Sequence, residues 1–215
     1  MGIEFQEIVN VDEDYFHQAI QIYDEAFPSN EKQSLDIIKN RIQERKSKLV
    51  VGIIESEVVC MSLIWEFDSL DFVLLDYMAV SKNHRNKNLG TQLFQYLSKI
   101  ISGINKYMII EVENHLFGNN SKERKRRINF YIQNGAHVLD NVNYILPSLD
   151  GTIPTEMMLM ISPKYKNNSI NSELVRDLIS RLYIELYKRN ENDIVLIKML
   201  KQLPNKIILN NKKLL

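Results

Sequence analysis

The sequence predicts an α+β domain, layered in the manner of α/β proteins, with helices on both faces of a central sheet. Two observations predict this class. Apolar residues first recur at helical spacing, then at strand spacing from about residue 48, and the two patterns alternate afterwards. Hydrophobic residues also make up 45% of the 215 residues, which is enough for a core and argues against disorder.

The first part of the chain predicts a strand, two helices and a hairpin. Phe16, Ile20 and Tyr23 follow helical spacing, and Pro28 ends that helix. Two apolar strands turn at Glu55–Glu57, and the strand after them is apolar on both faces, as a central strand is. The predicted elements are a strand at 3–10, helices at 14–28 and 34–46, a hairpin at 48–67 and a central strand at 71–80.

Helices and strands continue to alternate after the central strand. Asn134 and Gly135 form a C-cap signal that ends one of the later helices. From about Ser172 the chain becomes helical again, with a stripe formed by Leu174, Leu178, Leu182 and Leu186. The elements are a helix at 91–102, a strand at 106–113, a helix from 126 that leads into a strand, a strand at 155–162, a linker at 164–171 and two final helices. We therefore expect a domain at 1–163 and a helical C-terminal extension at 164–215.

Charge, cysteine content and hydropathy exclude several classes of protein. Lysine plus arginine and aspartate plus glutamate number 27 each, which argues against a general polyanion-binding protein and makes nucleic acid an unlikely partner. Cys60 is the single cysteine, which fits a reducing compartment. The N-terminus lacks the pattern of a secretory signal, and no apolar stretch approaches the roughly 18 residues that cross a bilayer. We expect a cytoplasmic protein without membrane contact.

The loop between the central strand and the next helix has the properties of a phosphate-binding loop. The first turn of a helix carries unpaired N–H groups and partial positive charge, which attract phosphates. Gly90 lets a ligand approach the backbone there, Asn88 tolerates a left-handed conformation, and Arg85 and Lys87 add positive charge. On composition alone, a solvent-exposed loop with one glycine is the simpler interpretation.

The segment "LLDYMAVSKNHRNKNLGTQLFQYL" resembles the acetyl-CoA-binding segment of the GNAT (Gcn5-related N-acetyltransferase) superfamily. The family pattern is Arg/Gln-x-x-Gly-x-Gly/Ala, and this chain reads Arg85, Asn86, Lys87, Asn88, Leu89, Gly90. Asn88 replaces the first glycine. A second segment, "FYIQNGAHV", is similar to the family's "LYxKxGF" helix end, and the order of elements from Ile3 to Ile161 also resembles the family. The resemblance implies the GNAT fold, a central, mixed and mostly antiparallel sheet flanked by helices.

The resemblance also implies a function, the transfer of an acetyl group from acetyl-CoA to a primary amine by direct attack. Acetyl-CoA is then a cosubstrate, and the acceptor is a small-molecule or peptide amine. Tyr131 matches the family tyrosine that protonates the CoA thiolate. Lys125 stands where the family commonly has an asparagine, within a basic cluster that in the family lies near the CoA phosphates. The residues implied in cofactor binding are Met78, Ala79 and Val80 at the strand end, Arg85, Asn86, Lys87, Asn88, Leu89, Gly90 and Thr91 in the loop, and Lys125.

Three carboxylates are candidates for the base that deprotonates the amine. Glu111 matches a strand glutamate used by acetyltransferases of ribosomal-protein amino termini, and it shares a strand face with Glu113. Asp76 lies inside an apolar strand, where an acid is costly unless it is partnered. We rank Glu111 first and Asp76 second. A solvated strand edge is the alternative for Glu111 and Glu113.

Other readings stay open at this stage. The four histidines are scattered without the spacing of metal ligands, so no metal is expected. The runner-up function is a non-catalytic acyl-CoA-binding or regulatory module that keeps the GNAT fold, which the replacements by Asn88 and Lys125 would favour. The leucine stripe of the extension packs either on its own sheet or on a partner chain, and a homodimer is one such arrangement.

Overall fold

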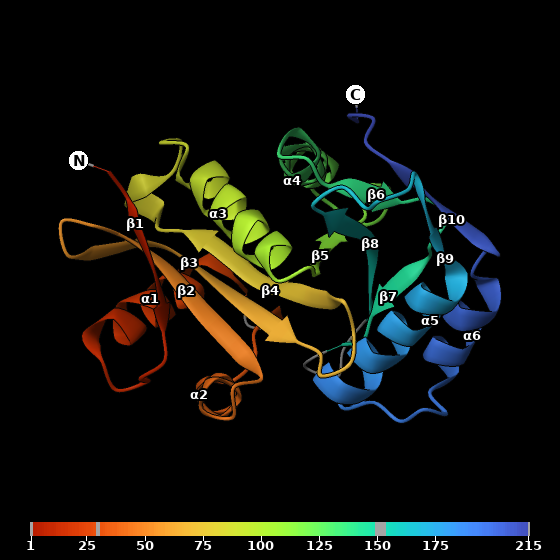
Figure 1. The fold of residues 1–215 in the computed structure, drawn as a ribbon, viewed down its shortest axis with the longest axis horizontal. Helices are drawn as coiled ribbons and strands as arrows, with labels where there is room; N and C mark the ends of the chain where they lie inside the picture. Colours follow the sequence, from red (N-terminus) through yellow and green to blue (C-terminus); the bar gives the residue numbers. More distant parts are fainter. Residues whose placement is uncertain (1, 29–30, 149–153, 215) are drawn as a thin grey trace. The chain divides into compact units, whose positions relative to one another are not determined.

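The computed structural model describes residues 2–28, 31–148 and 154–214, which form two compact units. The first unit ends at Lys106 and the second begins at Tyr107. Each unit contains both strands and helices, so the predicted α+β class is confirmed (Figure 1). Each unit is described by itself below.

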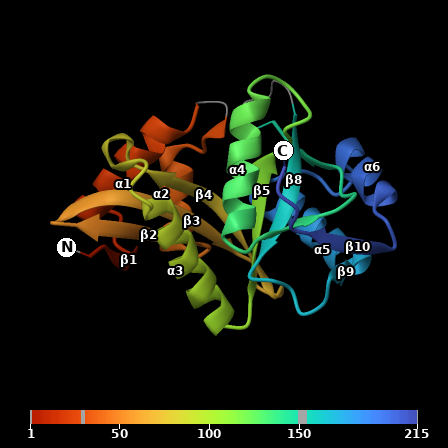
Figure 2. The ribbon, with the colours of Figure 1, turned by 90° about the horizontal axis from the view of Figure 1, so that it is seen from above.

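The first unit is an antiparallel meander covered by helices. Its strands follow the order β1-β2-β3-β4, and every pairing between them is antiparallel. Figures 1 and 2 show α1 and α2 on one face of these strands and α3 on the other. The elements are β1 (Glu4–Ile8), α1 (Asp14–Ala26), α2 (Leu35–Gln43), β2 (Ser47–Ile54), β3 (Glu57–Glu66), β4 (Phe72–Val80), the 3-10 helix η2 (Lys82–His84) and α3 (Leu89–Gly103).

The predicted turn between β2 and β3 is confirmed and has a tight geometry. Glu55 and Ser56 both have positive φ, at 51° and 65°. Two successive residues with positive φ form the type of two-residue turn whose twist matches that of a hairpin. The hairpin places β3 beside β4, which carries the first group of predicted site residues.

The core of the first unit lies between the meander and α1 with α2. Phe16 and Tyr23 of α1 and Ile38 of α2 are almost completely buried against apolar side chains of the strands. Tyr77 and Ala79 of β4 belong to this core. Since side chains alternate along a strand, the intervening Met78 and Val80 face the other way and are only half-buried.

The second unit contains antiparallel strand pairs with helices on both sides. Its strands follow the order β5-β8-β6-β10-β9, and β7 pairs with β8. Figures 1 and 2 show α4 and the pair α5 and α6 on opposite sides of these strands. The elements are β5 (Tyr107–Glu113), α4 (Ser121–Gln133), β6 (His137–Leu139), β7 (Tyr144–Leu146), β8 (Thr155–Ser162), β9 (Ser169–Asn171), α5 (Ser172–Arg181), the π-helix η3 (Leu182–Leu186), α6 (Ile194–Gln202) and β10 (Lys206–Asn210).

The C-terminal extension contains strands as well as helices. The predicted helix from Ser172 is found, but part of the predicted linker forms β9, and β10 pairs with both β6 and β9. Leu178, Leu182 and Leu186 are buried as the predicted stripe requires, whereas Leu174 is 40% exposed. The next residue, Val175, takes its place in the core. The stripe therefore packs within the chain.

Candidate functional site

The loop from Ser81 to Asn88 connects β4 to α3 in a conformation that requires left-handed residues. Asn86 and Asn88 have φ of 64° and 61°. Asparagine tolerates this region better than other residues with a side chain, so Asn88 takes a conformation that glycine would adopt there. Replacing the family glycine with Asn88 is therefore compatible with a tight turn directly before α3.

Hydrogen bonds connect this loop to the ends of β3 and β4 and stabilise its first turn. The backbone N–H of Ser81 donates to the carbonyl of Val59 at 2.9 Å, and the N–H of His84 donates to the carbonyl of Ser81 at 2.9 Å. The Ser81 hydroxyl also lies 2.9 Å from Nδ1 of His84. Arg85 Nε donates to the carbonyl of Val80 at 3.4 Å. The strand end and the start of the loop are thus fixed relative to each other.

The first turn of α3 forms an electropositive end beside this loop. The amide groups of Leu89, Gly90 and Thr91 have no acceptor within the helix, because the first turn of every α-helix lacks one. This turn has no acidic residue, and Arg85 and Lys87 are exposed in the loop before it. Leu89 is 5% exposed and anchors the turn in the core. These features fit the pyrophosphate of a bound CoA, since an anion is stabilised by helix N-terminal amides and nearby cations.

Asp76 lies at a β-bulge in β4. Leu63 of β3 pairs with Tyr77 and Ile64 pairs with Leu75, so Asp76 has no partner residue in the register. Bulges redirect side chains and are common next to active sites. The Asp76 side chain is 10% exposed, and its Oδ2 lies 3.5 Å from Nη1 of Arg41 in α2. Burial raises the pKa of Asp76 to about 6, against the lowering effect of the Arg41 guanidinium.

Aromatic side chains surround the Asp76–Arg41 pair. The Arg41 guanidinium stacks over the Trp65 ring, 5.1 Å from its centroid. The Tyr77 hydroxyl donates to the carbonyl of Glu31 at 2.8 Å, and burial raises the pKa of Tyr77 far above its ordinary value, with Asp76 adding to the effect. Asp76 therefore faces the guanidinium of Arg41, and Trp65 and Tyr77 lie near this pair.

Glu111 of the second unit lies in β5 and accepts two hydrogen bonds from tyrosines. The hydroxyl of Tyr144 in β7 donates to Oε1 at 2.5 Å, and the hydroxyl of Tyr187, directly after η3, donates to Oε2 at 2.5 Å. Burial and the nearby Glu111 carboxylate raise the pKa of Tyr144 well above its ordinary value. Both donors are neutral hydroxyls.

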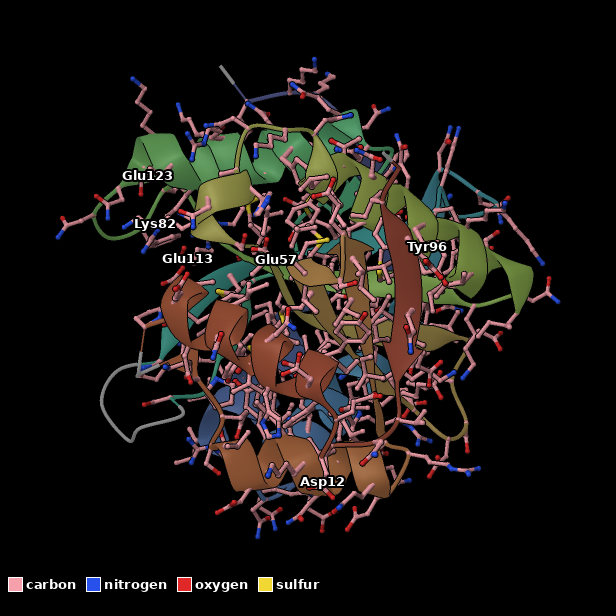
Figure 3. All side chains as sticks on the ribbon, turned by 90° about the vertical axis from the view of Figure 1, so that its left-hand side faces the viewer. Asp12, Glu57, Lys82, Tyr96, Glu113 and Glu123 are labelled. Carbon is pink, nitrogen blue, oxygen red and sulfur yellow. The ribbon has the colours of Figure 1, made fainter. Side chains whose placement is uncertain are left out.

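Glu113, two residues further along β5, has a different environment. Its carboxylate lies 2.8 Å from Nη2 of Arg124 and 2.8 Å from Nη1 of Arg127, both in α4. Figure 3 labels Glu113 at the end of β5 and Glu123 in the first turn of α4. The sequence predicts that Glu111 and Glu113 share one face of the strand. In the structure Glu113 joins β5 to α4 through ion pairs, whereas Glu111 accepts hydrogen bonds from two tyrosines.

Tyr131 lies in the buried face of α4. Its side chain is 8% exposed, and burial raises its pKa to about 12, with Arg127 acting in the opposite direction. The hydroxyl is therefore protonated at physiological pH and can donate a hydrogen bond or a proton. Gly135, with φ of 90°, ends α4 as the C-cap signal predicts, and the N–H of Ala136 donates to the carbonyl of Tyr131 at 3.0 Å.

Lys125 is half-buried in the first turns of α4. Burial first, and then the charge of Lys125, lower the pKa of His115. Helix α4 begins at Ser121, so the basic cluster of residues 122–127 belongs to the helix. Arg124 and Arg127 of this cluster are engaged by Glu113.

The predicted residues thus fall into two groups. The first unit contains Asp76, the strand end Met78–Val80 and the loop 85–91, and the second contains Glu111, Lys125 and Tyr131. Sequence reasoning missed Arg41, Tyr144 and Tyr187, the partners of the two candidate bases. No spacing in the sequence could have identified the tyrosines, because they lie 33 and 76 residues from Glu111.

Comparison with protein families adds an independent observation. Residues 16–121 match the family model described as the acetyltransferase (GNAT) family. The chain carries a GNAT-family domain. The match includes Asp76, the loop 85–91 and Glu111, and it ends before Lys125 and Tyr131. A comparison with curated protein sequences gave no match.

Solved structures show that the chain has the GNAT fold. A Bacteroides thetaiotaomicron protein assigned to the GNAT family is 20% identical, with a TM-score of 0.73 over 87% of this chain and 99% of that one. A Salmonella typhimurium protein whose structure contains its cofactor acetyl-CoA is 14% identical, with a TM-score of 0.56 over 78% of this chain and 96% of that one. The ribosomal-protein-S18-alanine N-acetyltransferase of Escherichia coli is 17% identical, with a TM-score of 0.54 over 78% and 98%.

Neither a membrane-spanning helix nor a metal-binding cluster occurs among the described residues of this GNAT-fold chain. Within 2–28, 31–148 and 154–214, no helix is long and apolar enough to cross a membrane. The same stretches contain no group of three or more His, Cys, Asp or Glu residues that could hold a metal ion.

Proposed function

We propose that this protein is an acetyl-CoA-dependent N-acetyltransferase that acts on a primary amine by direct attack. The observation that carries the proposal is the loop before α3. It combines left-handed Asn86 and Asn88, unpaired helix N-terminal amides, exposed cations and no acid in the first turn. This combination suits a pyrophosphate, and it lies inside the segment that matches the GNAT family.

The cosubstrate supplies an acetyl thioester, and the chain must bind it, deprotonate the acceptor and stabilise the departing thiolate. We assign binding to the loop 85–91 with the strand end Met78–Val80, and a supporting phosphate contact to Lys125. We assign Tyr131 as the donor to the thiolate, because its buried hydroxyl keeps its proton. The acceptor amine attacks the carbonyl once it has lost a proton.

Glu111 is the better candidate for the base. An amine reaches the enzyme as an ammonium ion, and a base must attract this cation before it accepts the proton. Asp76 already faces the Arg41 guanidinium, which would repel a second cation. Glu111 instead accepts hydrogen bonds from the neutral hydroxyls of Tyr144 and Tyr187.

Two glycines of α3 provide a matched test of cofactor binding. Gly90 lies in the first turn, where a side chain would occupy the expected ligand position, and Gly103 ends the same helix, with nothing within 4 Å of an added Cβ. We expect Gly90→Leu to weaken acetyl-CoA binding at least about tenfold in calorimetry, since it blocks close backbone approach. Gly103→Leu is expected to bind like the wild type. Equal binding by both variants would contradict the assignment of the loop.

A thiol-release assay then separates the transferase from a non-catalytic module. The wild-type protein is mixed with acetyl-CoA and a panel of amines that includes small amines, polyamines, aminoglycosides and peptides with free amino termini. Release of CoA with one of these classes supports the transferase and names its acceptor. Tight acetyl-CoA binding without release for the whole panel would instead indicate an acyl-CoA-binding module.

A further inference from the structure

We infer that Tyr144 and Tyr187 are positioning residues for Glu111, so that the C-terminal extension completes the catalytic apparatus. The inference rests on the proposed function. Glu111 lies in the GNAT-family segment, whereas Tyr144 and Tyr187 lie beyond residue 121, where that segment ends. Tyr187 belongs to the extension, residues 164–215.

The geometry at Glu111 fixes the orientation of the carboxylate. Each oxygen accepts one hydroxyl at 2.5 Å, Oε1 from Tyr144 and Oε2 from Tyr187. The terminal torsion of a glutamate is otherwise broad, so an isolated strand glutamate would sample many orientations. Two donors on different oxygens hold the carboxylate plane in one orientation, which a base needs in order to meet the proton of a bound amine.

The two donors are themselves held in place. Tyr144 is 1% exposed and lies in β7, where it pairs with Met157 of β8. Its ring packs edge-on against Tyr183, and Tyr183 packs edge-on against Tyr187, with interplanar angles of 81° and 83°. The Tyr183 hydroxyl donates to the carbonyl of Ile145. The rings of the three tyrosines therefore pack on one another, and the hydroxyls of Tyr144 and Tyr187 reach Glu111.

The π-helix η3 explains how Tyr187 can reach Glu111. The backbone N–H of Tyr187 donates to the carbonyl of Leu182 at 3.0 Å, five residues back, and not to Tyr183 as in an α-helix. Such a wide turn changes the direction of every later side chain by roughly 100°, the rotation of one helical residue. Leu182, Tyr183 and Leu186 stay buried through this turn while Tyr187 contacts Glu111. π-Helical turns are frequent at functional sites.

The charges around the network set the direction of its hydrogen bonds. Burial, followed by the Asp193 and Glu111 carboxylates, raises the pKa of Tyr183, and Arg189 acts against this rise. The pKa of Tyr144 is raised by burial and by Glu111. Glu113, on the same strand, forms ion pairs with Arg124 and Arg127. Tyr144 and Tyr183 thus keep their protons. In the pair with Glu111, Tyr144 therefore donates and the carboxylate accepts.

The test compares hydroxyls that contact Glu111 with one that does not. Tyr187→Phe and Tyr144→Phe each remove a donor to Glu111, and Tyr183→Phe is the matched control because its hydroxyl donates to the backbone carbonyl of Ile145. The readouts are kcat/KM against pH with an accepted amine, acetyl-CoA affinity by calorimetry, and thermal stability.

We expect Tyr187→Phe to lower kcat at least about tenfold while acetyl-CoA affinity stays within about twofold. The ionised carboxylate loses a donor, so the acidic limb of the pH profile should move to higher pH. Tyr144→Phe should act in the same direction. Tyr183→Phe should lose stability but keep the wild-type profile.

Three results would overturn the inference. If Tyr187→Phe and Tyr183→Phe had equal activity and the same pH profile, the tyrosines would be only a structural link between the extension and the sheet. Full turnover by Glu111→Gln would remove the base that they position. If wild-type protein bound acetyl-CoA but released no CoA with any amine, the proposed function would fail, and the positioning role with it.

Discussion

Asn88 shows that a backbone conformation, rather than a residue type, is what the loop before α3 requires. Its φ of 61° lies in the left-handed region, which costs most residues about 1–2 kcal/mol but is visited by Asn and Gly. The neighbouring Asn86 has φ of 64°. Two asparagines therefore form a turn for which glycine is the usual residue. The sequence indicated this tolerance of a left-handed conformation at Asn88.

Asp76 gives a prediction about stability and pH. Its pKa is raised to about 6 in the folded protein, while aspartates in an unfolded chain titrate near 3.9. Between these values the folded state binds the proton more tightly, so the free energy of unfolding falls as the pH rises. The contribution of this one residue is on the order of 3 kcal/mol across that interval. Asp76→Asn removes the dependence.

Denaturant unfolding from about pH 4 to pH 7 measures this effect. We expect the stability of the wild-type protein to fall relative to that of Asp76→Asn as the pH rises. Asp12→Asn is the control, because Asp12 is exposed after β1 (Figure 3). A difference between the wild type and Asp76→Asn that does not change with pH would show that the carboxylate is not held as described.

The sequence did not predict the residues that contact Asp76 and Glu111, because these partners lie far away along the chain. An acid inside an apolar strand could be recognised at Asp76, because the cost of burying a charge depends on the strand alone. Its partner Arg41 lies 35 residues earlier in α2 and has no distinguishing pattern. Tyr144 and Tyr187 are similar cases, since their contact with Glu111 depends on how β7 and η3 pack.

At the scale of elements, the strongest predictions came from periodicity and the weakest from short strands. The β2–β3 hairpin and the α4 C-cap are defined by neighbouring residues, and both were predicted. β9 has three residues within the polar stretch "KYKNNSIN", so it carries no readable alternation. β10 continues an apolar pattern that also suits a helix. Pairing with β6 decides its structure, and pairing is not visible in local sequence.

The link between β5 and α4 gives a prediction at this scale. Glu113 holds Arg124 and Arg127 near the start of α4, where unpaired cations oppose the helix dipole. We expect Glu113→Gln to lower the free energy of unfolding by about 2 kcal/mol, because two hydrogen bonds between charged groups become weaker. Acetyl transfer should stay within a few-fold of the wild type, since Glu113 is not the proposed base.

Glu111→Gln is the matched variant for that prediction, two residues away on the same strand. We expect it to lower turnover by about a hundredfold or more, with acetyl-CoA affinity retained. Denaturant unfolding and the thiol-release assay, run on both variants, separate the two roles. Similar losses of turnover in both variants would mean that the two carboxylates act together, and the distinction drawn from their partners would be wrong.

At the scale of the whole molecule, the boundary between the two compact units differs from the domain boundary that the sequence predicts. The first compact unit ends at Lys106, whereas the sequence suggests a domain boundary after residue 163. The extension supplies β9, α5, η3, α6 and β10 to the second unit, and Tyr187 to Glu111. Reciprocal hydrogen bonds between Asn129 and the backbone of Leu214, at 2.9 and 2.8 Å, hold the end of the chain on α4.

Truncation decides whether residues 1–163 form a domain of their own. Among the described residues, removal of 164–215 takes away eight apolar side chains that are at most 1% exposed, namely Ile170, Val175, Leu178, Ile179, Leu182, Tyr183, Leu186 and Ile207. Burial of one such side chain is worth about 1.5–3 kcal/mol, and a domain is stable by only about 5–15 kcal/mol in total. We therefore expect the second unit of the 1–163 chain to lose its ordered packing.

Hydrogen exchange followed by mass spectrometry measures each unit separately. In the 1–163 chain we expect the amides of β5, β6 and β8 to lose protection, because β6 no longer pairs with β10 and the apolar surface that the extension covers becomes exposed. The 1–210 chain is the control, since it loses the Asn129–Leu214 hydrogen bonds but keeps every strand and helix. Full protection in the 1–163 chain would establish the boundary at residue 163, and Tyr187 would then act on Glu111 from a separable appendage.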